Sequence, residues 1–146
     1  MPDLRWSAVL FSASLFTSCS GTAKAPVVSG ISPAARIQQI PSADSQKYAD
    51  MRDMKGWRNP YLIIRTDGVG VLDVANNEQQ VIDPNKLPEI LANLPPSAWP
   101  YGRVVAVQEN IVIGSEEDRA HIRKNRALVA GTLADLHVLI NWVPAA

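Results

Sequence analysis

Cys19 is the only cysteine in the 146 residues, and its place in the chain restricts what its thiol can do. It follows Arg5, a short apolar run over residues 6–18 and two small residues at the end of that run, Thr17 and Ser18. This order is typical of a secretory signal peptide. The run is shorter than the ~20 residues that a membrane-spanning helix needs. We therefore interpret residues 1–18 as a cleaved signal peptide.

The residues at the expected cleavage site, Thr17-Ser18-Cys19, resemble the lipobox of bacterial lipoproteins, although Phe16 stands where leucine is usual. The resemblance implies that Cys19 receives diacylglycerol and becomes the first mature residue, with fatty acids such as palmitate as a membrane anchor. It places the protein on the periplasmic side of the cell envelope. Ser20, rather than an aspartate, follows the cysteine, which favours the outer membrane. The alternatives are an uncleaved anchor that ends in a buried free cysteine, and ordinary secretion.

Nucleotide and zinc chemistry find little support among the other residues. Gly68-Val69-Gly70 begins like a dinucleotide-binding loop, but Asp73 stands where the third glycine belongs and a strand follows where a helix is needed. Neither His121 nor His137 has a second histidine or a cysteine at ligand spacing, so we expect no metal site.

Catalytic chemistry is not indicated either. No Gly-x-Ser-x-Gly elbow occurs, which removes the commonest cue for an exported serine hydrolase. The acidic run 116–118 is interpreted as charge that complements a helix N-terminus rather than as a carboxylate site. We therefore expect a protein that is not an enzyme and that uses no cofactor.

Two groups of residues are candidates for binding. Arg119, Arg123 and Arg126 lie on one face of a predicted helix, at i, i+4 and i+7. A solvated face is the default interpretation, and an anionic partner such as a cell-wall polymer is the alternative. Trp99 and Tyr101 stand in a predicted loop, where aromatic side chains either cover the core or anchor a partner.

The charge of the chain excludes two classes of partner. Its 14 basic and 14 acidic residues give a formal net charge of zero. There is no basic field to attract nucleic acid, and no polybasic patch to bind a membrane through charge. Membrane attachment is therefore expected through the lipid on Cys19.

Residues 19–56 are expected to be a lipidated N-terminus and a flexible tether. They are rich in Pro, Gly, Ser and Ala and show no sustained apolar period, although a short helix within Ser45–Met54 is compatible with the sequence. The folded domain is expected over residues 57–146. It begins at Trp57, which we expect to cover the core.

Six segments after residue 60 have the periodicity of strands or helices. A hairpin is predicted over residues 61–66 and 69–74 around an Asp-Gly turn, and Gln80–Ile82 extends or flanks it. Asp83-Pro84 is typical of an N-cap followed by proline in the first helical turn, and a helix is predicted to begin there or near Leu87 and to end near Leu94. A second helix is predicted from a Ser115 cap to Asp135, and further strands over residues 103–108 and 138–143. The order β-β-α-β-α-β indicates an α+β two-layer sandwich, a mixed sheet with two helices on one face. Alternation places Val138, Ile140 and Trp142 on one face of the last strand, and Leu139, Asn141 and Val143 on the other. Whether this strand is central or at an edge is open.

From Tyr61 to Val143 this order resembles the periplasmic domain of the ExbD/TolR biopolymer-transport family. The likeness lies in the Asp67-Gly68 turn, the short leucine-rich helix, the valine-rich strand, the longer helix and the closing apolar strand. It implies homodimers, and here strand pairing of the last strand is a further expectation. The family's transmembrane helix carries an aspartate that couples it to proton-driven motion, whereas the apolar run 6–18 contains no acid.

These observations predict a non-catalytic, lipid-anchored envelope protein. Its small periplasmic domain is expected to bind another envelope protein or a cell-wall polymer, with an accessory role in envelope transport. The alternative is a small exported enzyme or inhibitor without a recognisable motif. A concave pocket with converging polar groups favours the enzyme, and an open sheet edge favours the binding domain.

Overall fold

A computed structural model describes residues 30–51, 54–74, 78–110 and 114–144. Cys19 and the expected signal peptide lie outside the described residues. No helix in the described part of the chain is both long enough and apolar enough to cross a membrane.

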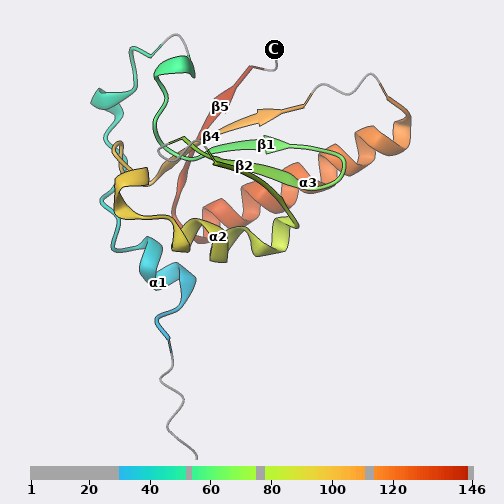
Figure 1. The fold of residues 1–146 in the computed structure, drawn as a ribbon. Coiled ribbons are helices and arrows are strands. Elements are labelled where there is room, and N and C mark those ends of the chain that lie inside the picture. Colours follow the sequence, from blue (N-terminus) through green and yellow to red (C-terminus); the bar gives the residue numbers. More distant parts are fainter. Residues whose placement is uncertain (1–29, 52–53, 75–77, 111–113, 145–146) are drawn as a thin grey trace, which may run out of the picture.

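The centre of the fold is a mixed sheet of five strands in the order β3-β2-β1-β4-β5 (Figure 1). The strands β1, β2 and β3 form an antiparallel meander, whereas β4 lies parallel to β1 and β5 parallel to β4. The predicted α+β class with a mixed sheet is confirmed. The strands are β1 (Tyr61–Ile64), β2 (Val69–Asp73), β3 (Glu78–Ile82), β4 (Val104–Glu109) and β5 (Leu139–Val143).

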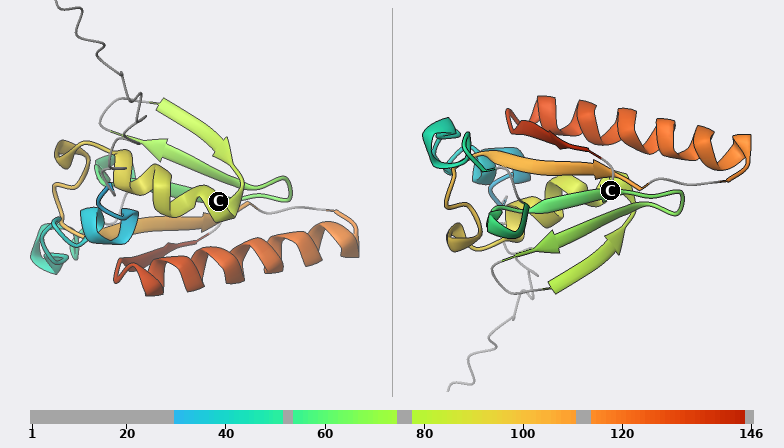
Figure 2. Two further views of the ribbon diagram at one scale, coloured as in Figure 1. Left: turned by 90° about the horizontal axis from the view of Figure 1, so that it is seen from below. Right: turned by 90° about the horizontal axis from the view of Figure 1, so that it is seen from above.

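Three helices cover one face of this sheet, as the two views of Figure 2 show: α1 (Pro33–Ile37), α2 (Leu87–Asn93) and α3 (Glu116–Asp135). The sequence predicted α2 and α3 but not α1. At β3 it predicted only that Gln80–Ile82 extends or flanks the hairpin, whereas the whole of β3 pairs with β2. The core between sheet and helices contains Leu62, Ile64, Leu91, Val107 and Leu133. A smaller cluster around Trp57 and Tyr101 covers part of the opposite face.

Local signals explain where the helices begin. The Ser115 hydroxyl accepts a hydrogen bond from the Asp118 N–H at 3.1 Å, and the Asp118 carboxylate accepts one from the Ser115 N–H at 2.9 Å, which is the capping box of α3. The Asp83 carboxylate accepts a hydrogen bond from the Asn85 N–H at 2.8 Å, and a short 3-10 turn from Pro84 leads into α2 at Leu87. Both predicted N-termini are confirmed.

The sequence predicted a flexible tether over residues 19–56. This prediction is wrong for the described residues from Ser32 onward. Ile37 of α1 is completely buried in the main core. Gln38 donates a hydrogen bond to the Leu136 carbonyl at 2.9 Å and accepts one from Arg103. The Asp44 N–H donates to the Tyr101 carbonyl at 2.9 Å. A helix as short as α1 shows no apolar period, because it provides only one buried position.

Candidate functional site

The strand β5 forms one edge of the sheet, and no strand pairs with its outer side within the described residues. Its inner side is bonded to β4, beginning with the Leu139 N–H that donates to the Arg103 carbonyl at 2.9 Å. Backbone groups alternate sides along a strand, so those of Leu139, Asn141 and Val143 face β4. The N–H and C=O groups of Ile140 and Trp142 therefore point to the free edge, where a further strand could bind them.

Two large apolar side chains of β5 are exposed at this edge. Leu139 is 57% and Trp142 is 42% exposed. They lie on opposite faces, since Trp142 pairs in register with Val107, which faces the helices, and Leu139 pairs with Val104, which faces the open side. The free edge is therefore apolar on both faces. The sequence predicted these two faces correctly from the alternation but did not decide that the strand lies at an edge.

The opposite edge of the sheet has a different character. The strand β3 exposes Glu78, Gln79, Gln80 and Val81, so three of its four exposed side chains are polar. Charged and polar side chains protect an edge strand against pairing with another chain. Of the two edges, β5 is the one without this protection.

Trp142 is held in place by an arginine of α3. The Arg126 guanidinium carbon lies 4.7 Å from the centroid of the Trp142 ring, a cation–π contact. The Arg126 Nη1 also binds the Glu109 carboxylate at 2.8 Å. The exposed indole is therefore oriented at the edge by a chain of contacts from β4 through α3 to β5. Figure 2 shows α3 running beside β5 and past the edge of the sheet.

The other two arginines of the predicted binding face bind a carboxylate of their own helix. Arg119 Nε lies 2.9 Å and Arg123 Nη2 2.7 Å from the two oxygens of Glu116. The hydrogen bonds from Arg123 and Arg119 lower the pKa of Glu116 below its usual value. The three predicted arginines are thus not brought together as one anion site, because Arg126 faces Trp142 and the other two neutralise Glu116.

Trp99 and Tyr101 are both buried, with 4% and 8% of their surfaces exposed. The Tyr101 hydroxyl donates to the Gly56 carbonyl at 3.0 Å, and its ring packs against Trp57 with the centroids 5.3 Å apart. Of the two roles that the sequence allowed, Tyr101 therefore covers the core. Trp57 is buried too, as predicted. Trp99 also lines a surface cavity and belongs to the main core.

The loop before β4 is organised by Asn59, which sequence reasoning missed. This side chain is completely buried. It donates to the carbonyls of Gly102 and Val104 at 2.7 Å each and accepts from the Tyr101 N–H at 2.9 Å. An asparagine before a proline gives only a turn signal in the sequence, so nothing local points to this role.

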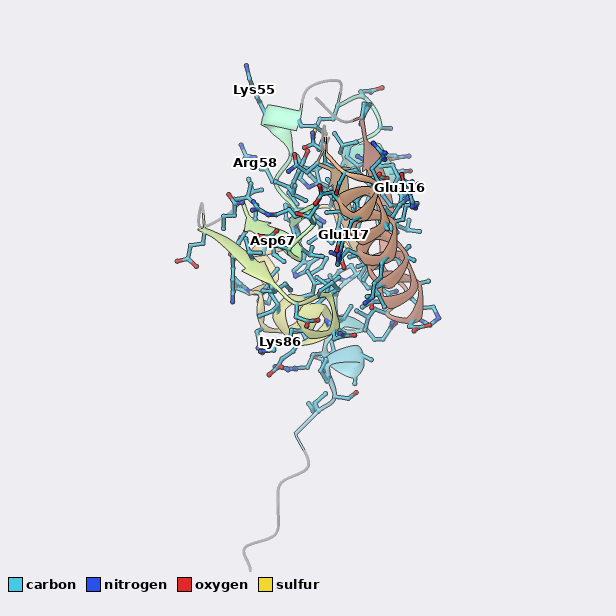
Figure 3. The ribbon with its side chains drawn as sticks, turned by 90° about the vertical axis from the view of Figure 1, so that its right-hand side faces the viewer. Lys55, Arg58, Asp67, Lys86, Glu116 and Glu117 are labelled. Carbon is cyan, nitrogen blue, oxygen red and sulfur yellow. The ribbon has the colours of Figure 1, made fainter. Side chains whose placement is uncertain are left out.

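In the part of the chain that the structure describes, the groups whose pKa values are shifted lie in separate local contacts. The described residues contain no cluster of three or more metal-ligating side chains. Figure 3 shows Lys55, Asp67, Lys86 and Glu116 spread over the surface. The pKa of Asp67 is lowered by its hydrogen bond from Arg65, and that of Asp118 by its hydrogen bond from Ser115, so both favour the ionised form. Burial raises the pKa of Tyr61, which donates to the Gln108 amide oxygen at 2.6 Å.

Comparisons with known proteins give this chain no relative. No family model, no curated protein and no solved structure matches it.

Proposed function

We propose that this chain is a lipid-anchored protein of the cell envelope whose folded domain is a non-catalytic interaction module, and that it pairs with a second copy through the free edge of β5. Acylation of Cys19 after removal of residues 1–18 provides the anchor. Two acyl chains, each methylene worth ~0.8 kcal/mol, suffice for stable attachment. The folded domain then lies on the periplasmic side, where pairing of neighbouring anchored copies is favoured by their high local concentration.

The observation that carries this proposal is the edge of β5, with which no strand pairs within the described residues. Leu139 and Trp142 are exposed there, and the backbone groups of Ile140 and Trp142 point outward without a strand to bind them within the described residues. An edge of this kind is a template for strand addition. The opposite edge at β3 is polar, so strand addition is favoured at β5 alone.

The sequence of β5 suits pairing with a copy of itself. In an antiparallel pair centred on Asn141, Ile140 lies opposite Trp142 of the partner subunit. Those two residues carry the outward N–H and C=O groups, so the hydrogen-bonding positions coincide. Leu139 then lies opposite Val143 of the partner subunit, apolar against apolar on the open face. A self-complementary edge of this kind forms a closed two-fold dimer rather than a filament.

A cysteine at the centre of this pair tests the proposal in the native envelope. Two residues facing each other at a non-hydrogen-bonded position have Cα atoms about 4.5 Å apart, within the roughly 4.4–6.8 Å range of disulfides. We expect Asn141→Cys to form a disulfide-linked dimer in the oxidising envelope. Gln80→Cys, a change at an exposed residue of the other edge strand, β3, is the control and should stay monomeric. If Asn141→Cys stays monomeric on non-reducing gels, or if both variants crosslink equally, pairing through β5 is wrong.

The lipid anchor is tested separately by the intact mass of the protein extracted from membranes. We expect a chain that begins at Cys19 and carries acyl groups, and we expect Cys19→Ser to be released or left unprocessed. An N-terminus at Met1, or an unmodified Cys19, contradicts the lipoprotein interpretation. This result is independent of the crosslinking experiment.

A further inference from the structure

A cavity of about 360 Å³ lies between α1, the segment that follows it and the turn after α2. This volume is at the lower end of the range of small-ligand sites, ~300–1,000 Å³. Much of its wall is apolar, and the small and aliphatic residues in this part are Ile40, Pro41, Ala92, Leu94 and Pro96. The side chains of Arg36 and Trp99 also line the cavity.

Arg36 is a half-buried cation without a carboxylate partner in the described part of the chain. Its Nη1 donates to the Asn93 side-chain oxygen at 2.8 Å, which orients the guanidinium. Its Nε is buried and has no hydrogen-bond partner among the described residues. The surface arginines differ, because Arg65 and Arg126 bind the carboxylates of Asp67 and Glu109 at 2.8 Å.

Trp99 provides a second buried donor at the same cavity. Its side chain is almost entirely buried, and its indole Nε1–H has no hydrogen-bond partner within the described residues. A buried N–H without a partner costs ~1–3 kcal/mol, so an acceptor that enters the cavity would remove this cost. Buried donors left unpaired are uncommon in native proteins and point to a missing partner.

We propose that this cavity binds the C-terminal carboxylate of a peptide whose last residue has a small apolar side chain. The Nε–Nη2 edge of a guanidinium binds a carboxylate through two parallel hydrogen bonds. In Arg36, Asn93 binds Nη1, and Nε is buried without a hydrogen-bond partner among the described residues. The Trp99 N–H adds a third donor. The apolar wall of Leu94 and Pro96 accommodates a side chain of the size of alanine or valine, and nothing in this wall favours a second charge.

This inference does not rest on the proposed pairing through β5. Arg36 and Trp99 lie on α1 and in the loop before β4, whereas the pairing depends on β5. Failure of one proposal therefore leaves the other untouched, and the crosslinking of Asn141→Cys reports only on the β5 edge.

The experiment uses the full mature chain, ¹⁵N-labelled at tryptophan, in detergent micelles. N-acetyl-alanyl-alanine is titrated while the indole N–H signal of Trp99, assigned by its loss in Trp99→Phe, is followed by NMR. We expect a saturable shift of this signal. The C-terminal amide of the same peptide should produce none, because it lacks the negative charge and one acceptor oxygen. Arg36→Gln should weaken binding by about tenfold or more.

Arg65→Gln is the matched control, since it removes a guanidinium that binds Asp67 rather than lining the cavity. It should bind the peptide like the wild type. If Arg36→Gln does not fold, Arg36→Lys keeps the positive charge but loses the two-donor edge and should also bind more weakly. A shift of equal size with the amide, no saturable shift at millimolar peptide, or unchanged affinity in a folded Arg36 variant would overturn the proposal.

Discussion

The side-chain oxygen of Asn59 accepts a hydrogen bond from the backbone N–H of Tyr101 at 2.9 Å, although the two residues are far apart in the sequence. The same amide donates to two further backbone carbonyls. The Asn59 side chain thus provides hydrogen bonds to backbone groups that a neighbouring strand would otherwise bind. This loop places Tyr101 against Trp57 and leads into β4.

Replacement of Asn59 should therefore be strongly destabilising. Asn59→Ala removes the partner of the Tyr101 N–H and of the Val104 carbonyl, whereas the Gly102 carbonyl keeps the Val104 N–H. We expect a loss of about 2–4 kcal/mol in the free energy of unfolding, measured in urea. Asn85→Ala is the control, because the Asn85 side chain is exposed. It should cost less than about 1 kcal/mol. Equal losses in the two variants would show that the buried hydrogen bonds of Asn59 contribute little.

The helix α1 should contribute to stability although it lies in the region expected to be a tether. Ile37 is completely buried, whereas Ile31, six residues earlier in the sequence, is 59% exposed. We expect Ile37→Ala to lower the free energy of unfolding by about 2–5 kcal/mol and Ile31→Ala to change it by less than about 0.5 kcal/mol. Thermal and urea unfolding of both variants provide the test. If Ile37→Ala behaves like Ile31→Ala, α1 does not belong to the folded unit.

One glycine-to-alanine change should destabilise the protein and another should stabilise it. Gly68 has φ +148°, and a Cβ there lies 2.4 Å from the Ile82 carbonyl oxygen, so we expect Gly68→Ala to cost about 1–3 kcal/mol. Gly131 lies within α3, and a Cβ there meets no atom within 4 Å. Gly131→Ala should therefore raise stability by about 0.5–1 kcal/mol. The midpoint of thermal unfolding should shift in opposite directions for the two variants.

The ion pairs at the start of α3 should make a pH-dependent contribution to stability. Hydrogen bonds from Arg123 and Arg119 lower the pKa of Glu116 in the folded state below the unperturbed 4.5. A lowered pKa stabilises the fold above the unfolded value, and this contribution is lost as the pH falls through the folded value. The difference in unfolding midpoint between wild type and Glu116→Gln should thus be constant above about pH 5.5 and should shrink below 4.5. A difference that does not change with pH contradicts these ion pairs.

A lysine at the free edge should prevent association without unfolding the domain. Leu139 is exposed, so Leu139→Lys costs little stability, yet its charge lies beside the backbone groups that a second strand would use. We expect this variant to be monomeric by light scattering at concentrations where the wild type is dimeric. Val81→Lys is the same kind of change on the exposed β3 edge and should leave the dimer intact. Dissociation by both lysines would point to general charge repulsion.

Much of the local structure was predictable from the sequence alone. The Ser115 capping box, the Asp83-Pro84 start before α2 and the Asp67-Gly68 turn each depend on residues close together in the chain. Their geometry is determined by short side chains that bind nearby backbone, and by glycine where a Cβ does not fit. The two faces of β5 followed from alternation, because successive side chains of any strand point to opposite sides. The α+β class followed from the order of these elements.

Only the tertiary structure decided how these elements pair, pack and cover one another. The place of β5 at an edge, the pairing of β3, the burial of Ile37 and the contact of Arg126 with Trp142 all join residues distant in the sequence. No local pattern specifies such contacts, because they depend on which surfaces remain uncovered once the other elements have packed. The same holds for the cavity at Arg36 and Trp99, whose donors come from segments far apart in the chain. Local chemistry determined the elements, and burial of apolar surface decided their arrangement.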